Sequence, residues 1–130
     1  MSYTLSTTVS GSFSDTINEV TARLNEVGFG VLTEIDLTKT LHEKIGVDIK
    51  PYRILGACNP TFANEALKME PTIGALLPCN VVVTDEGDGS CGIHIIDPVA
   101  MVKPTDNADL VPFALEVRGL LQSVLDGMQA

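Results

Sequence analysis

Two Cys-Asn pairs carry most of the chemistry that this sequence offers. Cys58-Asn59 follows a strand-like apolar run, and Cys79-Asn80 leads into three consecutive valines. Each cysteine stands where such a run meets a turn or a helix, a kind of position at which proteins often place reactive groups. A thiolate there could serve as a nucleophile, a redox group or a ligand for a soft metal ion.

Cys58 is the candidate nucleophile. Asn59 can cap a helix that begins at Pro60, which would place the Cys58 thiol close to a helix N-terminus. The unpaired N–H groups and the positive dipole end at that point favour a thiolate. Arg53 lies about 17 Å back along the strand, too far to assist from there. The alternative is a small buried side chain that fills a tight corner, because free cysteine is among the most buried residue types.

The role of Cys79 depends on the direction of its strand relative to the strand that ends at Cys58. If the two strands are antiparallel neighbours, both sulfurs lie at one end of the sheet and could share a metal ion or form a redox pair. If the strands are parallel, these ends are about 17–20 Å apart and no pair is possible. The separation of the two cysteines along the chain matches no compact zinc motif, so the signal for a metal site is weak, with Cys58 and Cys79 as the candidate ligands.

Three further residues complete the predicted ligand-binding set. Asn59 and Asn80 either cap backbone groups or offer a pair of amides to a substrate. Glu70 precedes Pro71 at a helix end, and its carboxylate is either solvated or available as a base or ligand. Cys91 is interpreted as an ordinary strand residue. His94 is interpreted as a solvent-facing or interface histidine, with a ligand or base as the alternative, and Met101 as a core or interface methionine, with a soft-metal ligand as the alternative. The sequence identifies no cofactor.

Composition narrows the class of protein. The chain has 130 residues, of which 45% are hydrophobic and 19% charged, the profile of a globular protein with one mainly aliphatic core. A formal charge of -9 argues against binding to nucleic acid or to an anionic membrane surface. The N-terminus has no signal-peptide pattern, so we expect a cytoplasmic protein with reduced thiols.

The elements that must position these residues follow from periodicity and from breaker residues. Alternation predicts strands and a spacing of three to four predicts helices, with Ser14 as the N-cap of the first helix and Gly28 as its stop. We expect strands at 3–9, 29–37, 52–58, 80–84 and 91–96, and helices at about 13–28, 38–46, 60–69 and 109–128, with a short helical turn at 72–77.

The glycine-rich turn at 85–90 joins two of these strands into a hairpin. A hairpin within a strand–helix alternation predicts an α+β fold. We expect one domain over residues 1–130, with a mainly antiparallel sheet of about five strands, helices on one face, and the order β-α-β-α-β-α-β-β-α. A doubly wound sheet is the alternative.

Several ordered motifs resemble the DUF302 family, a domain of unknown function also called TT1751-like. They are Gly28-Phe29-Gly30-Val31-Leu32-Thr33-Glu34-Ile35-Asp36, Leu55-Gly56-Ala57-Cys58-Asn59-Pro60, Glu70-Pro71, Ile73-Gly74, Leu76-Leu77-Pro78-Cys79-Asn80-Val81 and Asp97-Pro98. The resemblance implies a small α+β domain that forms homodimers. It supports Cys58 and Cys79 as positions of interest, and it implies no reaction because none is firmly assigned to the family.

Three functions remain open at this point. The first is a binding module that holds a small ligand or a soft metal ion near Cys58 and Cys79. The second is a thiol-dependent enzyme, for redox or transfer chemistry, with Cys58 as its nucleophile. The third is a structural or interaction domain in which both cysteines only fill space.

Overall fold

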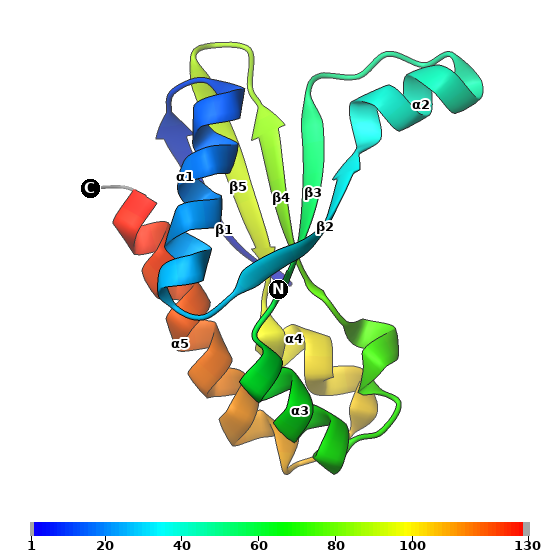
Figure 1. Cartoon of the computed structure of the whole chain (residues 1–130), viewed down its shortest axis with the longest axis vertical. Helices are drawn as coiled ribbons and strands as arrows, with labels where there is room; N and C mark the ends of the chain where they lie inside the picture. The colour runs from blue at the N-terminus through cyan, green and yellow to red at the C-terminus, as the bar shows by residue number, and fades with distance from the viewer. Residues whose placement is uncertain (1, 129–130) are drawn as a thin grey trace.

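The computed structural model describes residues 2–128, and its centre is a five-stranded sheet (Figure 1). Every pair of neighbouring strands is antiparallel, and the spatial order β1-β5-β4-β3-β2 places β1 and β2 at the edges. The α+β prediction is confirmed, and the doubly wound alternative is wrong because it requires parallel strands. The strands are β1 (Thr4–Ser10), β2 (Gly30–Asp36), β3 (Tyr52–Cys58), β4 (Cys79–Asp85) and β5 (Ser90–Ile96).

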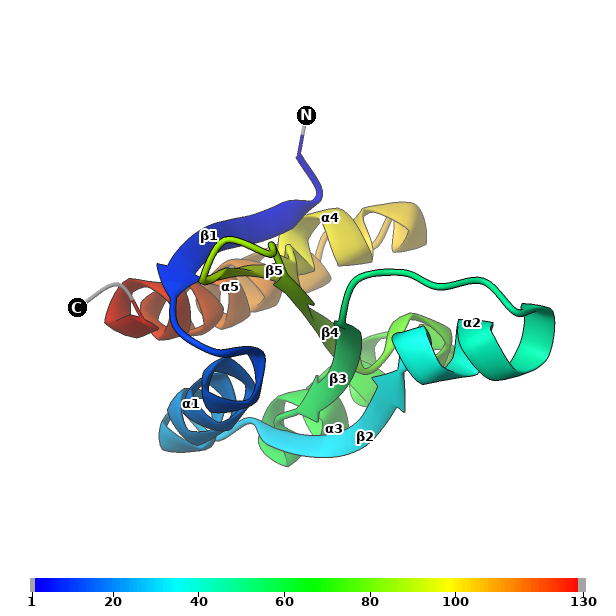
Figure 2. The ribbon, with the colours of Figure 1, turned by 90° about the horizontal axis from the view of Figure 1, so that it is seen from above.

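Two long helices cover one face of the sheet (Figure 2). Alternate residues of the central strands, among them Val81, Val83, Ile93 and Ile95, are fully buried beneath them, as expected for side chains that point to one face. The described helices are α1 (Phe13–Glu26), α2 (Leu37–Ile45), α3 (Pro60–Met69), α4 (Pro98–Val102) and α5 (Leu110–Met128), with 3₁₀ turns η1 (Ile73–Leu76) and η2 (Lys103–Thr105). α1 and α5 are the two that cover the sheet.

The opposite face of the sheet is partly exposed to solvent. We call it the open face and define it by six alternate strand residues, all of intermediate exposure: Thr4, Tyr52, Ile54, Val82, His94 and Ile96. Its mixture of aliphatic, aromatic and polar side chains contrasts with the aliphatic face under α1 and α5.

A second apolar cluster lies beyond the ends of the strands, where α3, η1 and α4 meet the first half of α5 (Figure 1). Its buried members are Ala66, Ile73, Val102, Leu110 and Ala114. This cluster continues the main core past the sheet and encloses the ends of β3 and β4, where the two cysteines lie.

The first helix has its N-cap at Ser12, two residues before the predicted cap. The Ser12 Oγ accepts a hydrogen bond from the Asp15 N–H at 3.1 Å, and Ser12 has an extended backbone. Ser14, the predicted N-cap, already lies inside α1, so that prediction is wrong. Ser12 is the better cap because helical geometry starts directly after it, at Phe13.

α4 is the one α-helix that the sequence analysis did not predict. Asp97 caps it by accepting a hydrogen bond from the Val99 N–H at 2.9 Å, and Pro98 is its first residue. This repeats the Asn59-Pro60 pattern that opens α3, so the signal was present. The sequence analysis had interpreted Asp97-Pro98 only as the end of a strand.

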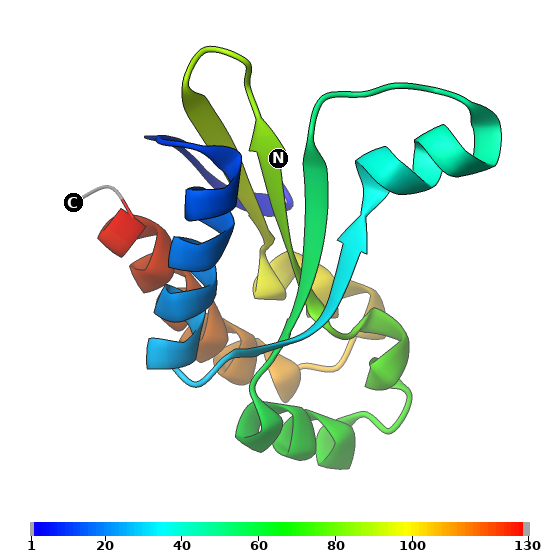
Figure 3. The same ribbon diagram turned by 45° about the horizontal axis from the view of Figure 1, so that its top comes forward.

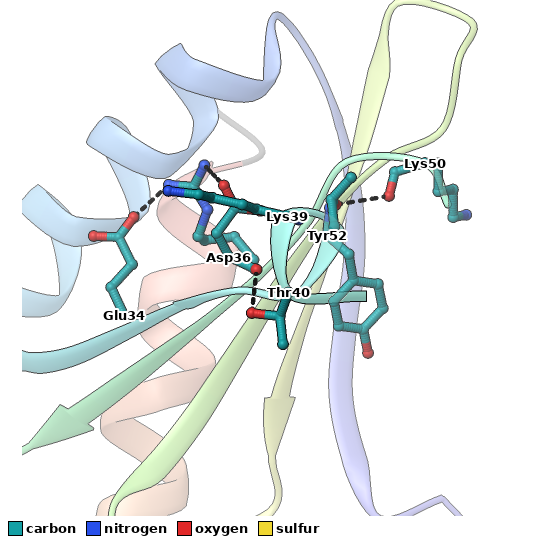
Figure 4. A network of polar contacts seen from close by, with 8 residues as sticks. Glu34, Asp36, Lys39, Thr40, Lys50 and Tyr52 are labelled. Carbon is teal, nitrogen blue, oxygen red and sulfur yellow. Dashed lines mark hydrogen bonds and ion pairs between the residues drawn. The ribbon is translucent and has the colours of Figure 1, made fainter. Parts of the chain in front are cut away.

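A segment that we call the arm (residues 37–51) joins β2 to β3 and carries α2 away from the other helices (Figure 3). Its base is fixed by hydrogen bonds. The Thr38 hydroxyl donates to the Lys50 carbonyl at 3.1 Å and accepts from the Tyr52 N–H at 2.8 Å, and Thr40 donates to the Asp36 carbonyl at 3.0 Å (Figure 4). No residue of α2 is buried.

Arg53 supports the strand that leads into the arm. Its guanidinium forms ion pairs with Glu34 and with Asp36, the latter at 3.5 Å, and lies over the Phe13 ring at 5.6 Å. The arginine therefore ties β2 and β3 to the start of α1, while Lys50 at the end of the arm pairs with Glu86 at 3.2 Å. None of the described helices has the length and apolar sequence needed to cross a membrane.

Candidate functional site

The structure brings Cys58 and Cys79 to the same end of the sheet. β3 and β4 are antiparallel neighbours, and Cys79 pairs with Ala57, so Cys58 lies one residue beyond the partner of Cys79. On its other side Cys58 pairs with Gly30 of β2. Because β3 and β4 are antiparallel, the two thiols lie near each other. A shared role for the two cysteines requires this arrangement.

Both cysteines line a small apolar cavity of about 40 Å³ between the sheet end and the three helices α3, α4 and α5. A space of this size has room for a bound atom or a very small molecule, but not for a metabolite. Met101, from α4, also lines it, so three sulfur-bearing side chains from three elements border one cavity. The other lining residues are almost all apolar: Phe29, Ala57, Asn59, Phe62, Ala63, Ala66, Ile73, Leu77, Pro98, Val102, Phe113, Ala114 and Val117.

The two thiols differ in their access to solvent. Cys79 is 6% exposed, and burial, with a smaller contribution from the neighbouring Cys58, raises its pKa from 9.0 to about 11. Cys79 is therefore a neutral thiol at physiological pH. Cys58 is partly exposed. An external reagent would reach Cys58 first, and a ligand inside the cavity would contact both.

Asn59 acts as the helix cap that the sequence predicts. Its Oδ1 accepts hydrogen bonds from the Thr61 N–H at 3.1 Å and the Phe62 N–H at 3.2 Å. A Cβ on Gly28 would lie 2.8 Å from the Asn59 Nδ2, so the absence of a side chain at Gly28 leaves space for this amide. Asn59 thereby fixes the start of α3 beside Cys58.

Two residues of the predicted ligand-binding set lie outside the cavity. Asn80 is exposed and lines a groove of about 770 Å³ that runs along the lower part of the open face. Glu70 follows α3, and its Oε1 accepts a hydrogen bond from the Asn107 Nδ2 at 3.3 Å. The structure therefore assembles Cys58, Asn59 and Cys79 around one space and separates Asn80 and Glu70 from it.

Cys91 and His94 have the surroundings expected of strand residues. Cys91 is fully buried near the opposite end of the sheet, where its Sγ–H donates to the Gly11 carbonyl at 3.6 Å. His94 lies on the open face, and its Nδ1 is 2.8 Å from the Ser6 Oγ. Alternation along β5 had placed His94 opposite Ile93 and Ile95.

Met101 provides the third sulfur beside the cavity, a position that its sequence context indicates only weakly. A methionine is usually a core residue, and Met101 stands in the helix that the analysis missed. The cap at Asp97 was the available signal, because it turns the chain after β5 back beneath the sheet and toward the two cysteines.

The fold of this chain is shared with known proteins. A family model described as "Domain of unknown function DUF302" matches residues 5–128. The chain belongs to the DUF302 family. This confirms the resemblance that the ordered motifs had indicated.

A DUF302 protein from Bacillus stearothermophilus, an uncharacterized conserved protein of known crystal structure, is 31% identical in sequence. The superposition has a TM-score of 0.92 and covers 99% of this chain and 100% of that one. No curated protein matches the chain. The comparisons thus establish the DUF302 fold and leave its function unassigned.

Proposed function

We propose that this DUF302 domain is a binding module whose site is the sulfur-lined cavity at Cys58 and Cys79, and that its ligand is a soft monovalent metal ion, copper(I). The observation that carries the proposal is the convergence of two thiols and the thioether side chain of Met101 on one small apolar space. Thiolate and thioether sulfurs are the ligands that copper(I) prefers.

The donor set favours copper(I) over zinc. Structural zinc sites almost always have four ligands drawn from cysteine, histidine and carboxylates. Among residues 2–128, no group of three or more His, Cys, Asp or Glu side chains could hold a metal ion. A low-coordinate soft ion requires fewer donors, and Cys58, Cys79 and Met101 supply them.

The protonation state of Cys79 gives the proposed site a defined pH dependence. A metal ion must displace the Cys79 proton, and burial holds that proton to a pKa of about 11. We therefore expect copper(I) to release a proton from Cys79 and to bind more tightly as the pH rises from 6 to 8.

The test is a titration of reduced protein with copper(I), without oxygen, in competition with a colorimetric copper(I) chelator. We expect one ion per chain in the wild type, loss of binding in Cys58→Ser and Cys79→Ser, and weaker binding in Met101→Leu. Cys91→Ala is the matched control, because Cys91 is also buried in the sheet but pairs with Asp85, six residues and roughly 20 Å along β4 from Cys79. Unchanged binding in the Cys58→Ser/Cys79→Ser double variant would refute the site.

A second candidate function is a thiol-dependent enzyme, and the partial exposure of Cys58 beside the N-terminus of α3 favours it. An enzyme with Cys58 as nucleophile predicts that iodoacetamide modifies Cys58 in the folded protein near neutral pH, while Cys79 reacts only after denaturation. A Cys58 that reacts no faster than Cys79 in the folded protein would rule out this function.

We further propose that the protein is a single-domain homodimer in the cytoplasm. Cytoplasmic conditions would keep the three free cysteines reduced, as a thiol site requires. The DUF302 resemblance is the basis for the homodimer. A mass near the 13.8 kDa of one chain in light scattering at micromolar concentration would contradict it.

A further inference from the structure

α2 is a well-formed helix that buries none of its residues. It has nine residues, and isolated helices of that length are marginal in water. Leu37, Leu41 and Ile45 recur every four residues along one side, and Ile45 is 67% exposed. An amphipathic helix of this kind gains most of its stability from packing, and within this chain Leu37 and Leu41 are only half-buried.

The exposed apolar side chains of the molecule are concentrated around this helix. The large hydrophobic residues that are exposed within residues 2–128 are Tyr3, Leu32, Ile35, Ile45, Val47, Leu67, Val111 and Leu115. Half of them lie between residues 32 and 47, on the edge strand β2 and on the arm. Exposed apolar side chains gathered on one edge of a domain are typical of interaction surfaces.

The charge of the arm differs in sign from that of the rest of the chain. Residues 37–51 contain three lysines, Lys39, Lys44 and Lys50, and two carboxylates, Glu43 and Asp48. The remainder of the chain has five basic and fifteen acidic residues. Lys50 pairs with Glu86 of its own chain at 3.2 Å, so Lys39 and Lys44 are the charges of the arm that would attract the acidic body of a second copy.

The open face offers a receiving surface of suitable shape. The groove of about 770 Å³ along it has an aliphatic and aromatic floor and wall that include Tyr52, Val82, Ile96 and Leu76. Figure 2 shows α2 on the opposite side of the sheet from α1 and α5, which is the side of the open face. Two chains placed with their open faces together would each direct an arm toward the other.

We propose that α2 of one protomer packs into the open-face groove of a second copy, and that the two arms exchange reciprocally about a two-fold axis. The inference rests on the homodimer proposed above and assigns its interface. A two-fold arrangement makes the contact twice, with the same patch used on both subunits. Leu41 and Ile45 would enter the groove, and Lys39 and Lys44 would face the acidic body of the partner.

Pairing between two β2 edges is the competing arrangement, and the structure disfavours it. A bulge between Val31 and Thr33 interrupts the ladder of β2, and such irregularities protect edge strands from pairing. The two carboxylates of the strand, Glu34 and Asp36, are already paired with Arg53 of their own chain, so they offer no charge to a second β2 edge. The arm carries two exposed lysines, Lys39 and Lys44.

The interface is tested by light scattering, which measures the mass of the wild type and of Ile45→Asp at 10 and 100 µM protein. We expect a dimer for the wild type and at least tenfold weaker association for Ile45→Asp, with an unchanged circular dichroism spectrum because Ile45 is 67% exposed in the monomer. Lys39→Glu/Lys44→Glu is a second variant that should weaken association in the same direction. Leu115→Asp is the matched control, since Leu115 is 55% exposed on α5 and should leave the dimer intact.

Photo-crosslinking then locates the contact. With p-benzoylphenylalanine in place of Lys44 and a mixture of heavy- and light-isotope chains, we expect crosslinks between different chains to groove residues such as Tyr52 and Met101. A dimer that survives Ile45→Asp, or crosslinks that map to β2 of the partner, would overturn the interface while leaving the dimer standing. A wild-type monomer at 100 µM would overturn both.

Discussion

The two ends of β3 present opposite situations. At the Cys58 end, α3, α4 and α5 enclose the strand and surround a cavity with buried apolar side chains. At the Tyr52 end, the arm carries a helix in which nothing is buried. Both helices that adjoin β3 have side-chain caps, from Asn59 and from Asp36. Capping therefore explains why each helix forms, and packing within the chain accounts for the stability of only one.

The largest effect we expect comes from the enclosed end. Ile73 is 2% exposed in the second cluster and lines the cavity, so Ile73→Ala should lower the free energy of unfolding by about 2–5 kcal/mol. Ile45→Ala on the arm should change it by less than about 0.5 kcal/mol in dilute monomer. Urea unfolding of both variants measures the contrast. Equal losses at the two positions would show that α2 is packed within its own chain.

The next effect depends on the protonation of Cys79. Its pKa is raised in the folded state, so the folded protein retains a proton that the unfolded chain has lost between pH 9 and 11. Stability from this group is fully present below pH 9 and declines as the pH rises toward 11, by about 3 kcal/mol in total. Urea unfolding at pH 8 and pH 11 should show the loss in the wild type.

Cys79→Ala is the control for that measurement. Other groups that titrate in the same range, such as tyrosines and lysines, contribute to both proteins and cancel in the difference. We expect the variant to be less stable than the wild type at pH 8 and to lose about 3 kcal/mol less on going to pH 11. Parallel pH profiles for the two proteins would mean that Cys79 is not held as a neutral thiol.

The sequence predicts a region well when the structure of that region depends on residues that are close together along the chain. β3 and α3 were predicted with their observed bounds, because Tyr52–Cys58, the cap at Asn59 and the stop near Met69 are all local signals. Strand direction is not local. No pattern near Cys58 or Cys79 indicates that β3 and β4 are antiparallel. The sequence therefore predicts that the two thiols lie close together only if the two strands are antiparallel.

The exposure of the arm could not be predicted from the sequence for a similar reason. The spacing of Leu37, Leu41 and Ile45 is that of a helix with a packed side, and nothing in it tells whether the packing partner lies in the same chain. Met101 was undervalued because α4 is short, and its cap at Asp97 resembles the end of a strand. In both cases the sequence identifies the residues, but it does not show which other residues they contact in the folded protein.

Two glycines with positive φ offer a closer comparison of body and arm. Gly28, with φ of +87°, follows α1 in the body, and Gly28→Ala should lower the free energy of unfolding by about 2 kcal/mol. The cost has two sources: the left-handed backbone, and a new Cβ placed 2.8 Å from the Asn59 amide that caps α3. Thermal unfolding followed by calorimetry measures it. A variant as stable as the wild type would show that Asn59 can move aside without losing its cap.

Gly46, with φ of +67°, ends α2 in the same left-handed conformation, but a Cβ there would meet no neighbouring atom within 4 Å. The backbone cost of Gly46→Ala is about 1 kcal/mol, and it should fall on the helix alone. In dilute protein we expect less than about 0.5 kcal/mol of change in global stability, with amide exchange in α2 about fivefold faster. If the arm docks on a second copy, raising the protein concentration should slow exchange in the α2 of the wild type and leave α3 unchanged. Slow exchange in α2 at every protein concentration would mean that the helix is stable without a partner. The two ends of β3 would then differ in surface exposure and not in stability.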